Sequence, residues 1–435
     1  MTSIYFVGPY RPIMCGIAEY TNFIVRQIPP SKWGVITFDP ERYGGSLITE
    51  NGFPRERVWY GITGREGLSA QVINQGLKHF NADDSDSVVW FQHENGIFPD
   101  DRRFIETLKG LKIPKIVTFH TLHFQSNETP YGLRQSQYEF LKVLLPCVDA
   151  ITVFSHGVYR AVSTAFPQYR EKVYVIKHGV HYYPEICRLS RKEARNALLK
   201  FLLGQPDLDE KSKRDMISRN ILTDEGNYII GETGFLTPGK QSEYLYAVRE
   251  ILQRMSPEKK LVAIRIGAAR DACQQSYKAR LAKIQNGQDK FLLETCLPEH
   301  MLRIAQRAFD LNFYWPKECS QSGILSHALG VSGLIAGRDM EGSGETLRNA
   351  GAITSTEFSG ILMGIRNHLM SPELSIKAQE CALKYAAEFC WQNQAARHLE
   401  VASKITCRNP RLTHKVPAGV PTRDILPQMA RISMT

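Results

Sequence analysis

Two kinds of segment alternate through residues 1–181 of this chain. Short apolar runs that end in a polar or glycine-containing turn predict strands, and longer segments with apolar residues every three or four positions predict helices. The runs are almost continuously apolar, as in parallel strands covered on both faces. The predicted strands are Ile4–Gly8, Val35–Phe38, Val88–Gln92, Ile116–Phe119, Ala150–Phe154 and Val173–Ile176, with helices from Ile17 and around 67–80, 102–110, 134–146 and 156–166.

Residues 182–226 interrupt this alternation. Ser190 and Glu193 have the spacing of a helix capping box, and a second charged helical segment runs from Asp209 to Ile221. We interpret the region as a linker with a helical insertion. It is either a helical hairpin packed on the domain joint or an arm that faces an acceptor or a membrane.

The alternation restarts at residue 227 and predicts a second α/β unit. Its predicted strands are Tyr228–Gly231, Leu261–Ile266, Phe291–Leu293, Phe313–Trp315 and Leu334–Gly337, and the chain from Glu357 onward reads as helical. A doubly wound sheet of this kind binds its ligands at the carboxyl ends of the strands.

Composition agrees with two domains of a globular protein. The chain has 435 residues, 43% of them hydrophobic and 23% charged. We find no apolar run of the roughly 20 residues that a membrane helix needs, and the first ten residues do not have the pattern of a secretory signal. The nine cysteines are scattered without a C-x-x-C pair, so neither a disulfide framework nor a zinc site is indicated. We expect a cytoplasmic protein.

The formal net charge of +10 fits several kinds of partner. It is compatible with anionic small substrates, with an anionic membrane surface, or with solubility alone. Because no zinc finger and no aromatic RNA-binding motif is present, we do not expect nucleic acid to be the partner.

Polar residues follow several predicted strands of the first half. They would meet at one edge of the sheet, where ligands bind in α/β proteins, although single histidines at such positions are often core residues. The four groups are Cys15-Gly16, Gln92-His93-Glu94-Asn95, His120-Thr121-Leu122-His123 and Lys177-His178-Gly179.

A phosphate site is predicted in the second half. The turn Ser320-Gln321-Ser322-Gly323 lies between a strand and a helix, and the free N–H groups of such a helix start favour a negative charge. Lys240 and Arg270 follow two other strands and would lie at the same sheet edge, where two cations would suit a diphosphate. The alternative is an ordinary strand-to-helix loop.

Six stretches, taken in order, carry a family resemblance. Together they resemble family 4 glycosyltransferases of the GT-B fold, specifically the mannosyltransferase-like branch, from Ile4 to about Cys407. The insertion (182–226) and a basic tail (408–435) lie outside the resemblance. The stretches are GPYRPIMCGIAEYT (8–21), FQHENGIF (91–98), VTFHTLHF (117–124), VIKHGV (175–180), TGFLTPGK (233–240) and SQSGILSHALG (320–330).

The resemblance implies an architecture. Two Rossmann-like, doubly wound α/β domains would face each other across a cleft, and C-terminal helices would cross back. The expected parts are an acceptor-side domain (1–181), the helical linker (182–226), a nucleotide-sugar-binding domain (227–390), a helix packing on the first domain (391–407) and a basic tail (408–435).

The resemblance also implies a reaction. A hexose, glucose or mannose, would pass from a UDP- or GDP-sugar to a glycan or lipid-linked acceptor in polysaccharide biosynthesis. The anomeric configuration would be retained, with no metal ion and no cofactor. A lipid-linked acceptor would suit a basic protein that lies at the inner face of a membrane.

Residue roles follow from the same resemblance. His120 would contact the donor sugar and its diphosphate, Lys240 would bind the diphosphate, and Glu94 would help His120 to orient the reactants while the leaving phosphate accepts the proton. We expect donor binding from Gly16, Lys240, Arg265, Arg270, Ser320, Gln321, Ser322, Gly323 and Glu345, and acceptor contacts from Cys15, His93, Asn95 and His123.

The chain departs from the family pattern at three positions. Cys319 and His327 stand where many members have a pair of glutamates, and Phe235 stands where an arginine usually precedes the lysine. Arg265 or Arg270 would then replace that arginine. Two other hypotheses remain open: a sugar-nucleotide-binding protein without catalysis, and a sugar-nucleotide hydrolase or epimerase of the same fold.

Overall fold

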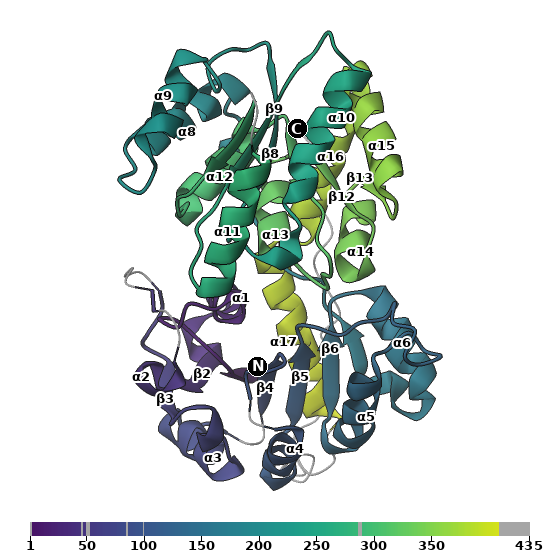
Figure 1. Ribbon diagram of the computed structural model, residues 1–435. Helices are drawn as coiled ribbons and strands as arrows, with labels where there is room; N and C mark the ends of the chain where they lie inside the picture. The colour runs from purple at the N-terminus through teal and green to yellow at the C-terminus, as the bar shows by residue number, and fades with distance from the viewer. Residues whose placement is uncertain are drawn as a thin grey trace, which may run out of the picture.

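A computed structural model describes residues 2–44, 47–48, 53–83, 86–98, 100–285 and 289–408. The chain forms two α/β domains, one above the other in Figure 1, each built on a sheet whose paired strands all run parallel. The predicted fold class of two doubly wound domains is confirmed. The basic tail predicted over 408–435 lies outside the described residues except for Arg408.

The sheet of the first domain has seven strands in the order β3-β2-β1-β4-β5-β6-β7. β3 has no counterpart among the predicted strands, because it is an edge strand in which four of the five residues, Gly61 among them, are only half-buried. The strands are β1 (Ser3–Val7), β2 (Trp33–Phe38), β3 (Val58–Ile62), β4 (Ser87–His93), β5 (Lys115–Phe119), β6 (Ala150–Val153) and β7 (Val173–Val175).

Helices cover both faces of this sheet, which is why its central strands are buried throughout. Ser69, Asp100 and Ser155 start three of these helices, and each side chain accepts a hydrogen bond from a backbone N–H of the first turn. The helices are α1 (Gly16–Val25), α2 (Pro40–Tyr43), α3 (Ala70–His79), α4 (Asp101–Gly110), α5 (Gln135–Leu144) and α6 (His156–Ala165).

The linker contains α7 (Pro184–Cys187), α8 (Arg191–Leu203) and α9 (Glu210–Ser218). The capping box predicted at Ser190 and Glu193 is present. α8 and α9 lie at the end of the second domain that faces away from the first (Figure 1). Leu198 and Leu202 are fully buried in one apolar cluster with residues of the second sheet, so the helical insertion extends the core of that domain.

The sheet of the second domain has six strands in the order β10-β9-β8-β11-β12-β13. The strands are β8 (Asn227–Thr233), β9 (Lys260–Ile266), β10 (Lys290–Leu293), β11 (Leu311–Tyr314), β12 (Ile335–Arg338) and β13 (Ile353–Ser355). The helices are α10 (Glu243–Met255), α11 (Ala272–Ile284), α12 (Glu299–Ala308), α13 (Gly323–Gly330), α14 (Glu341–Asn349), α15 (Phe358–Met370) and α16 (Pro372–Glu388).

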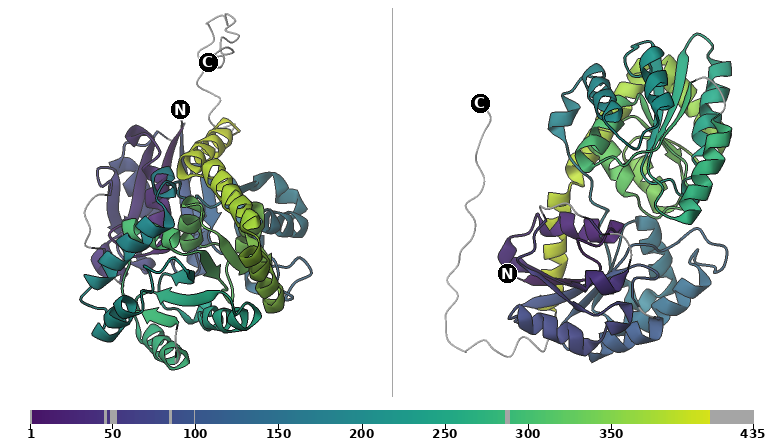
Figure 2. Two further views of the ribbon diagram at one scale, coloured as in Figure 1. Left: turned by 90° about the horizontal axis from the view of Figure 1, so that it is seen from above. Right: turned by 60° about the vertical axis from the view of Figure 1, so that its left-hand side comes forward.

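The chain then returns to the first domain through α17 (Trp391–Cys407), which packs against α1, β1 and β4 (Figure 2). Trp391, Ala402 and Ile405 share an apolar cluster with Ile4 and Phe6 of β1. The loops that follow β5 and β11 meet at the joint between the domains, where Ser320 contacts His120. Within the described residues, none of the helices is both long and apolar enough to traverse a bilayer.

Candidate functional site

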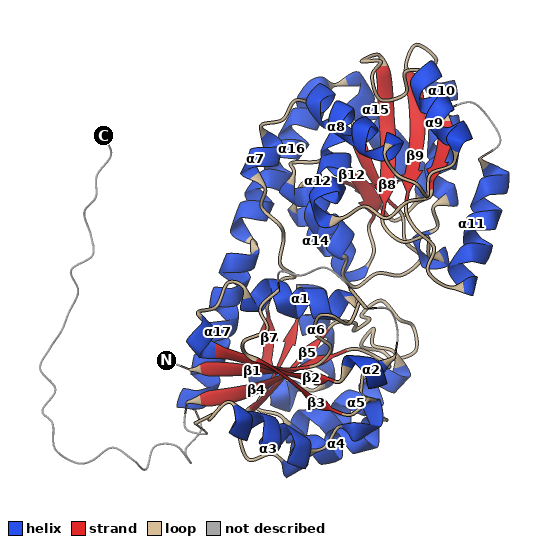
Figure 3. Cartoon of the chain, turned by 90° about the vertical axis from the view of Figure 1, so that its left-hand side faces the viewer, coloured by secondary structure: helices blue, strands red, loops and turns tan. Residues whose placement is uncertain are grey.

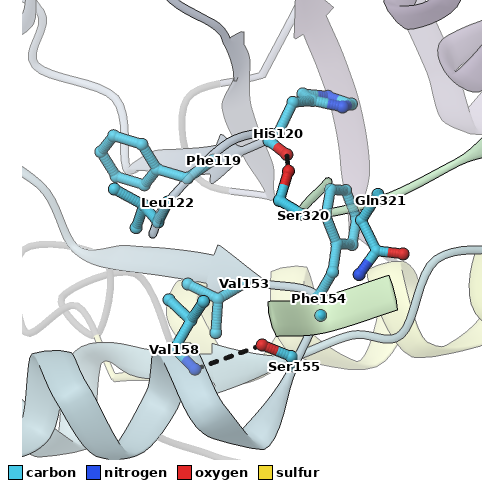
Figure 4. A pocket seen from close by; sticks show the side chains of 10 residues that line it. Phe119, His120, Leu122, Val153, Phe154, Ser155, Val158, Ser320 and Gln321 are labelled. Atoms are coloured by element: carbon cyan, nitrogen blue, oxygen red, sulfur yellow. Dashed lines mark hydrogen bonds between the residues drawn. The ribbon is translucent and has the colours of Figure 1, made fainter. Parts of the chain in front are cut away.

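The two predicted ligand-binding edges meet at a pocket between the domains. Ser320 of the second domain donates a hydrogen bond from its Oγ to the main-chain oxygen of His120 in the first, at 3.0 Å. Figure 4 shows this contact with the lining side chains of the pocket. The lining residues are Phe119, His120, Leu122, Val153, Phe154, Ser155, Val158, Ser320, Gln321 and Gly342.

The predicted phosphate turn opens helix α13. Ser322 is its N-cap and accepts a hydrogen bond from the Leu325 N–H at 3.3 Å, and Gly323 is its first residue. The N–H groups at the start of a helix point out of the helix end, where they carry partial positive charge. Ser320 and Gln321 lie just before this end and reach the interdomain pocket.

A second helix start lies on the facing edge. Cys15 is the N-cap of α1 and makes no side-chain capping bond, while Gly16 is the first helical residue and is exposed. The first turn of α1 therefore has no side-chain cap to compete with an anion.

Three glycines at these edges have free space where a side chain would be. An added Cβ at Gly16, Gly239 or Gly323 would meet no atom within 4 Å, and none of the three has a positive φ. Neither packing nor backbone conformation therefore requires glycine at these positions. A ligand that approaches the backbone closely at these positions would explain why they are occupied by glycine.

Lys240 follows β8 in a short turn, Pro238–Lys240. Its ammonium donates to the main-chain oxygen of Thr233 at 3.0 Å and lines a second pocket together with Glu232 and Gln306. Burial, and then the nearby Arg265 guanidinium, lower the pKa of Lys240 to about 7, against an opposing effect of Glu232. Lys240 is thus next to α13 but turned inward, and it would have to rotate to reach a ligand between the domains.

The two candidate arginines occupy different environments. Arg265 is fully buried, and its guanidinium donates to Ser242 Oγ and to main-chain oxygens that include that of Phe235. It therefore supports the loop after β8 and does not reach the cleft, which corrects the expectation of direct donor contact. Arg270 is exposed and lies flat on the Phe235 ring, with its Cζ 3.1 Å from the ring centroid. In the described parts of the chain no carboxylate forms an ion pair with Arg270.

His120 and Glu94 are held by neighbours within the first domain. The Nε2 atom of His120 lies 2.8 Å from Gln92 Oε1, and its ring packs edge-on against Tyr20 and Phe154. Burial, and then the neighbouring histidines, keep the pKa of His120 well below its ordinary value, so the ring is neutral. Figure 4 shows the ring directed away from Ser320. Glu94 accepts a hydrogen bond from Thr121 Oγ1 at 2.5 Å and from the N–H of Asn95, an exposed residue, at 3.0 Å.

Three expected ligand contacts are corrected by the surroundings of the side chains. His93 packs among Phe98, Phe104, Phe119 and Phe140, where burial lowers its pKa to about 4, so it is a core residue and not an acceptor ligand. His123 binds the Glu341 carboxylate across the joint at 2.9 and 3.0 Å. Glu345 also crosses the joint, to Lys177, and is therefore not free for a sugar or ribose.

The two positions that replace the glutamate pair are interior. Cys319 Sγ lies 2.8 Å from the Tyr314 hydroxyl, and His327 stacks on His181 with ring centroids 3.8 Å apart. Burial lowers the pKa of His327 to about 3, so neither position supplies a charge to the cleft.

Comparison with known proteins relates the chain to solved structures only. No protein-family model matches it, and neither does any curated protein. Anabaena HepE in complex with UDP is similar, with a TM-score of 0.62 and 12% identity over 93% of this chain and 100% of that one. An α,α-trehalose-phosphate synthase (UDP-forming) from Burkholderia xenovorans, in complex with glucose-6-phosphate, aligns with a TM-score of 0.63, 12% identity and the same coverage.

A third neighbour is the trehalose-6-phosphate synthase of Burkholderia multivorans, with a TM-score of 0.65 and 12% identity over 94% of this chain and 99% of that one. These alignments span nearly the whole of each chain. The chain has the GT-B fold. At this level of identity the likeness establishes the fold and leaves the reaction to the site itself.

Substituting Lys240 tests its predicted role. Without its ammonium, the charge on a departing diphosphate is less well stabilised, so we expect Lys240→Ala to lower sugar transfer by at least about tenfold. With a pKa of about 7, Lys240 in the ligand-free protein loses its charge as pH rises above that value. UDP affinity of the natural protein should therefore also fall above about pH 7. Calorimetric titration with UDP between about pH 6 and about pH 9 should show that UDP affinity depends less on pH in the variant than in the natural protein. Near-normal turnover, or an equal pH response, would contradict the role.

Gly323 offers a second test. The Cβ of a Gly323→Ala variant would meet no atom of the free protein but would lie at the start of α13, so UDP affinity should fall by at least about tenfold while Tm is unchanged. Gly204→Ala is the control, since its Cβ would make ordinary contacts at the end of α8, outside the cleft. Equal UDP affinity in the two variants would remove the phosphate site from α13.

Proposed function

We propose that this protein is a retaining glycosyltransferase that moves a hexose from a nucleoside-diphosphate sugar to a glycan or lipid-linked acceptor. The observation that carries the proposal is the interdomain pocket, where His120 of one domain meets Ser320 and Gln321 at the start of α13 in the other. Two helix starts, α1 and α13, and the cations Lys240 and Arg270 follow strands of the two sheets. This arrangement suits a pyrophosphate whose sugar is presented to the first domain.

The solved neighbours favour uridine in the donor. HepE has been crystallised with UDP and with UDP-glucose, and the trehalose-phosphate synthases are named as UDP-forming. We therefore propose UDP-glucose ahead of GDP-mannose. The finer assignment to the mannosyltransferase-like branch of family 4 is part of the proposal and is supported by the six sequence stretches.

The proposed chemistry requires little covalent participation by the protein. Departure of the sugar places negative charge on the diphosphate, which the α13 N-terminus, Arg270 and a rotated Lys240 would stabilise, an effect worth several kcal/mol in a site from which water is excluded. The leaving phosphate then accepts the proton of the acceptor hydroxyl. Glu94, fixed by Thr121 and the Asn95 N–H, would orient the sugar or the acceptor.

No metal ion or cofactor is part of the proposal, because fixed cations and helix ends can neutralise the diphosphate. A lipid-linked acceptor would bring the protein to the inner face of a membrane, where its positive charge would be favourable. A soluble glycan is equally compatible with the site.

Turnover with and without an acceptor tests the function. The protein would be incubated with UDP-glucose or GDP-mannose, and free UDP or GDP measured. We expect UDP release to depend on both the sugar donor and an added glycan or lipid-linked acceptor, and to continue in the presence of EDTA. Binding without turnover would favour a non-catalytic sugar-nucleotide-binding protein. Turnover without an acceptor would favour a hydrolase or epimerase.

Arg270 provides a residue-level prediction for this function. Its guanidinium, held on Phe235 and without a carboxylate partner among the described residues, would contact the diphosphate. Arg270→Ala should weaken UDP binding by at least about tenfold and leave uridine binding unchanged, since only the phosphates lose a partner. Arg280→Ala is a matched control, because Arg280 also lies over an aromatic ring, Tyr277, but pairs with Glu243. Equal UDP affinity in both variants would refute the assignment.

A further inference from the structure

Helix α14 stands at the joint between the domains, beside α6 of the first domain (Figure 1). Glu341 and Glu345 are four residues apart on this helix and so project from the same side. Both carboxylates contact the first domain, and both residues are more than nine-tenths buried. Neither contact could be recognised from the sequence, because the partners are more than 160 residues away.

Glu345 makes the denser of the two contacts. Its carboxylate forms an ion pair with Lys177 and accepts hydrogen bonds from the backbone N–H groups of His156 at 2.9 Å and Gly157 at 3.0 Å. These N–H groups belong to the first turn of α6, so the carboxylate of one domain caps a helix of the other.

Glu341 contacts the first domain through side chain and backbone. Its carboxylate binds His123 Nδ1, and its N–H donates to Gln125 Oε1 at 3.1 Å. Its φ of +45° lies in the left-handed region, which is costly for a residue with a side chain. Such a conformation persists only where surrounding contacts impose it, and here they include those from the other domain.

The same helix turn touches the predicted donor site. Ser343 Oγ donates to the main-chain oxygen of Cys319 at 3.0 Å, and a Cβ on Gly342 would lie 2.4 Å from the main-chain oxygen of Ser320. α14 is thus fitted tightly between the 319–321 turn on one side and the first domain on the other.

We propose that Glu341 and Glu345 are positioning residues that couple docking of the two domains to the placement of the 319–321 turn in the donor site. This inference rests on the proposed function and specifies how its two half-sites are brought into register. The carboxylates act through the turn and the joint, without contacting substrate. The order of events is that docking forms the two cross-domain contacts, and the seated helix then holds Ser320 and Gln321 at the pocket.

The electrostatics explain why one missing partner would separate the domains. With Glu345 neutral, Lys177 would remain almost fully buried without its counter-charge, and it could regain water only if the joint opened. Burial by itself raises the pKa of Glu345, but Lys177 and the two N–H groups outweigh it, and the pKa lies below the ordinary value. The carboxylate contact is therefore present above the ordinary glutamate pKa and is lost only as pH falls through the lowered one. Docking through Glu345 does not change in the range where Lys240 titrates.

Two variants separate a positioning role from simple destabilisation. Glu345→Gln removes the charge, whereas Glu341→Gly removes the carboxylate and also relieves the positive φ, so its Tm should be unchanged or higher. We expect both to lower kcat for sugar transfer by at least about tenfold, because the first domain no longer meets the 319–321 turn. The UDP Kd should stay within about twofold, because on the proposed function the α13 N-terminus and Arg270, both within the second domain, hold the diphosphate. Small-angle scattering of the full chain should show a larger radius of gyration for both. Glu250→Gln, which loses an ion pair with Lys290 inside the second domain, is the control and should behave as the natural protein.

Opposite results would overturn the inference. These are a radius of gyration and kcat equal to those of the natural protein, or a fall in Tm and UDP affinity that parallels the fall in kcat. If the natural protein binds UDP but transfers no sugar, the proposed function fails. The radius of gyration alone then decides whether the two carboxylates hold the domains together.

Discussion

The chain crosses between the domains twice, once after β7 and once between α16 and α17, and the packing of these two segments is the constraint on which the rest of this structure depends. Val180, on the outgoing segment, donates its N–H to the main-chain oxygen of Phe389 on the returning one, at 2.9 Å. Gly179 lies so close to Trp391 that a Cβ would come within 2.1 Å of the indole ring. Because the two segments are packed together in this way, the predicted ligand-binding edges of both sheets are held toward each other, and the candidate site is divided between them.

Charge is distributed unevenly around that divided site. The second domain contributes Lys240, which lies near Ile324 of α13, and Arg270, which lies on Phe235, while Arg265 and Glu232 form a buried pair. The buried arginine donates to the main-chain oxygen of Phe235 in the loop after β8 and to that of Ile266 at the end of β9, and so fixes the shape of the loop. A buried ion pair of this kind contributes little net stability but makes alternative loop conformations costly, since each would leave a charge without a partner.

Histidines illustrate the limit of predicting sites from sequence. His93 ends one strand, and His120 and His123 follow the next one at the expected edge. One of them is packed among phenylalanines, one has its ring turned toward Gln92, and one pairs with Glu341 of the other domain. A residue type and its place after a strand predict which edge it occupies. The direction of the side chain depends on neighbours that are distant in sequence, and so does its pKa.

The sequence by itself determined the elements, the two doubly wound sheets and the sheet edge that each candidate residue occupies, because continuous apolar runs and glycine-containing turns act over a few residues. Short edge strands such as β3 and β13 escaped prediction, since their burial is too incomplete to leave a clear apolar pattern. Only the tertiary structure decided that Arg265 supports a loop, that Lys240 turns inward, and that Glu345 joins the two domains. Each of these outcomes depends on burial and on partners brought together by folding, and no local pattern contains that information.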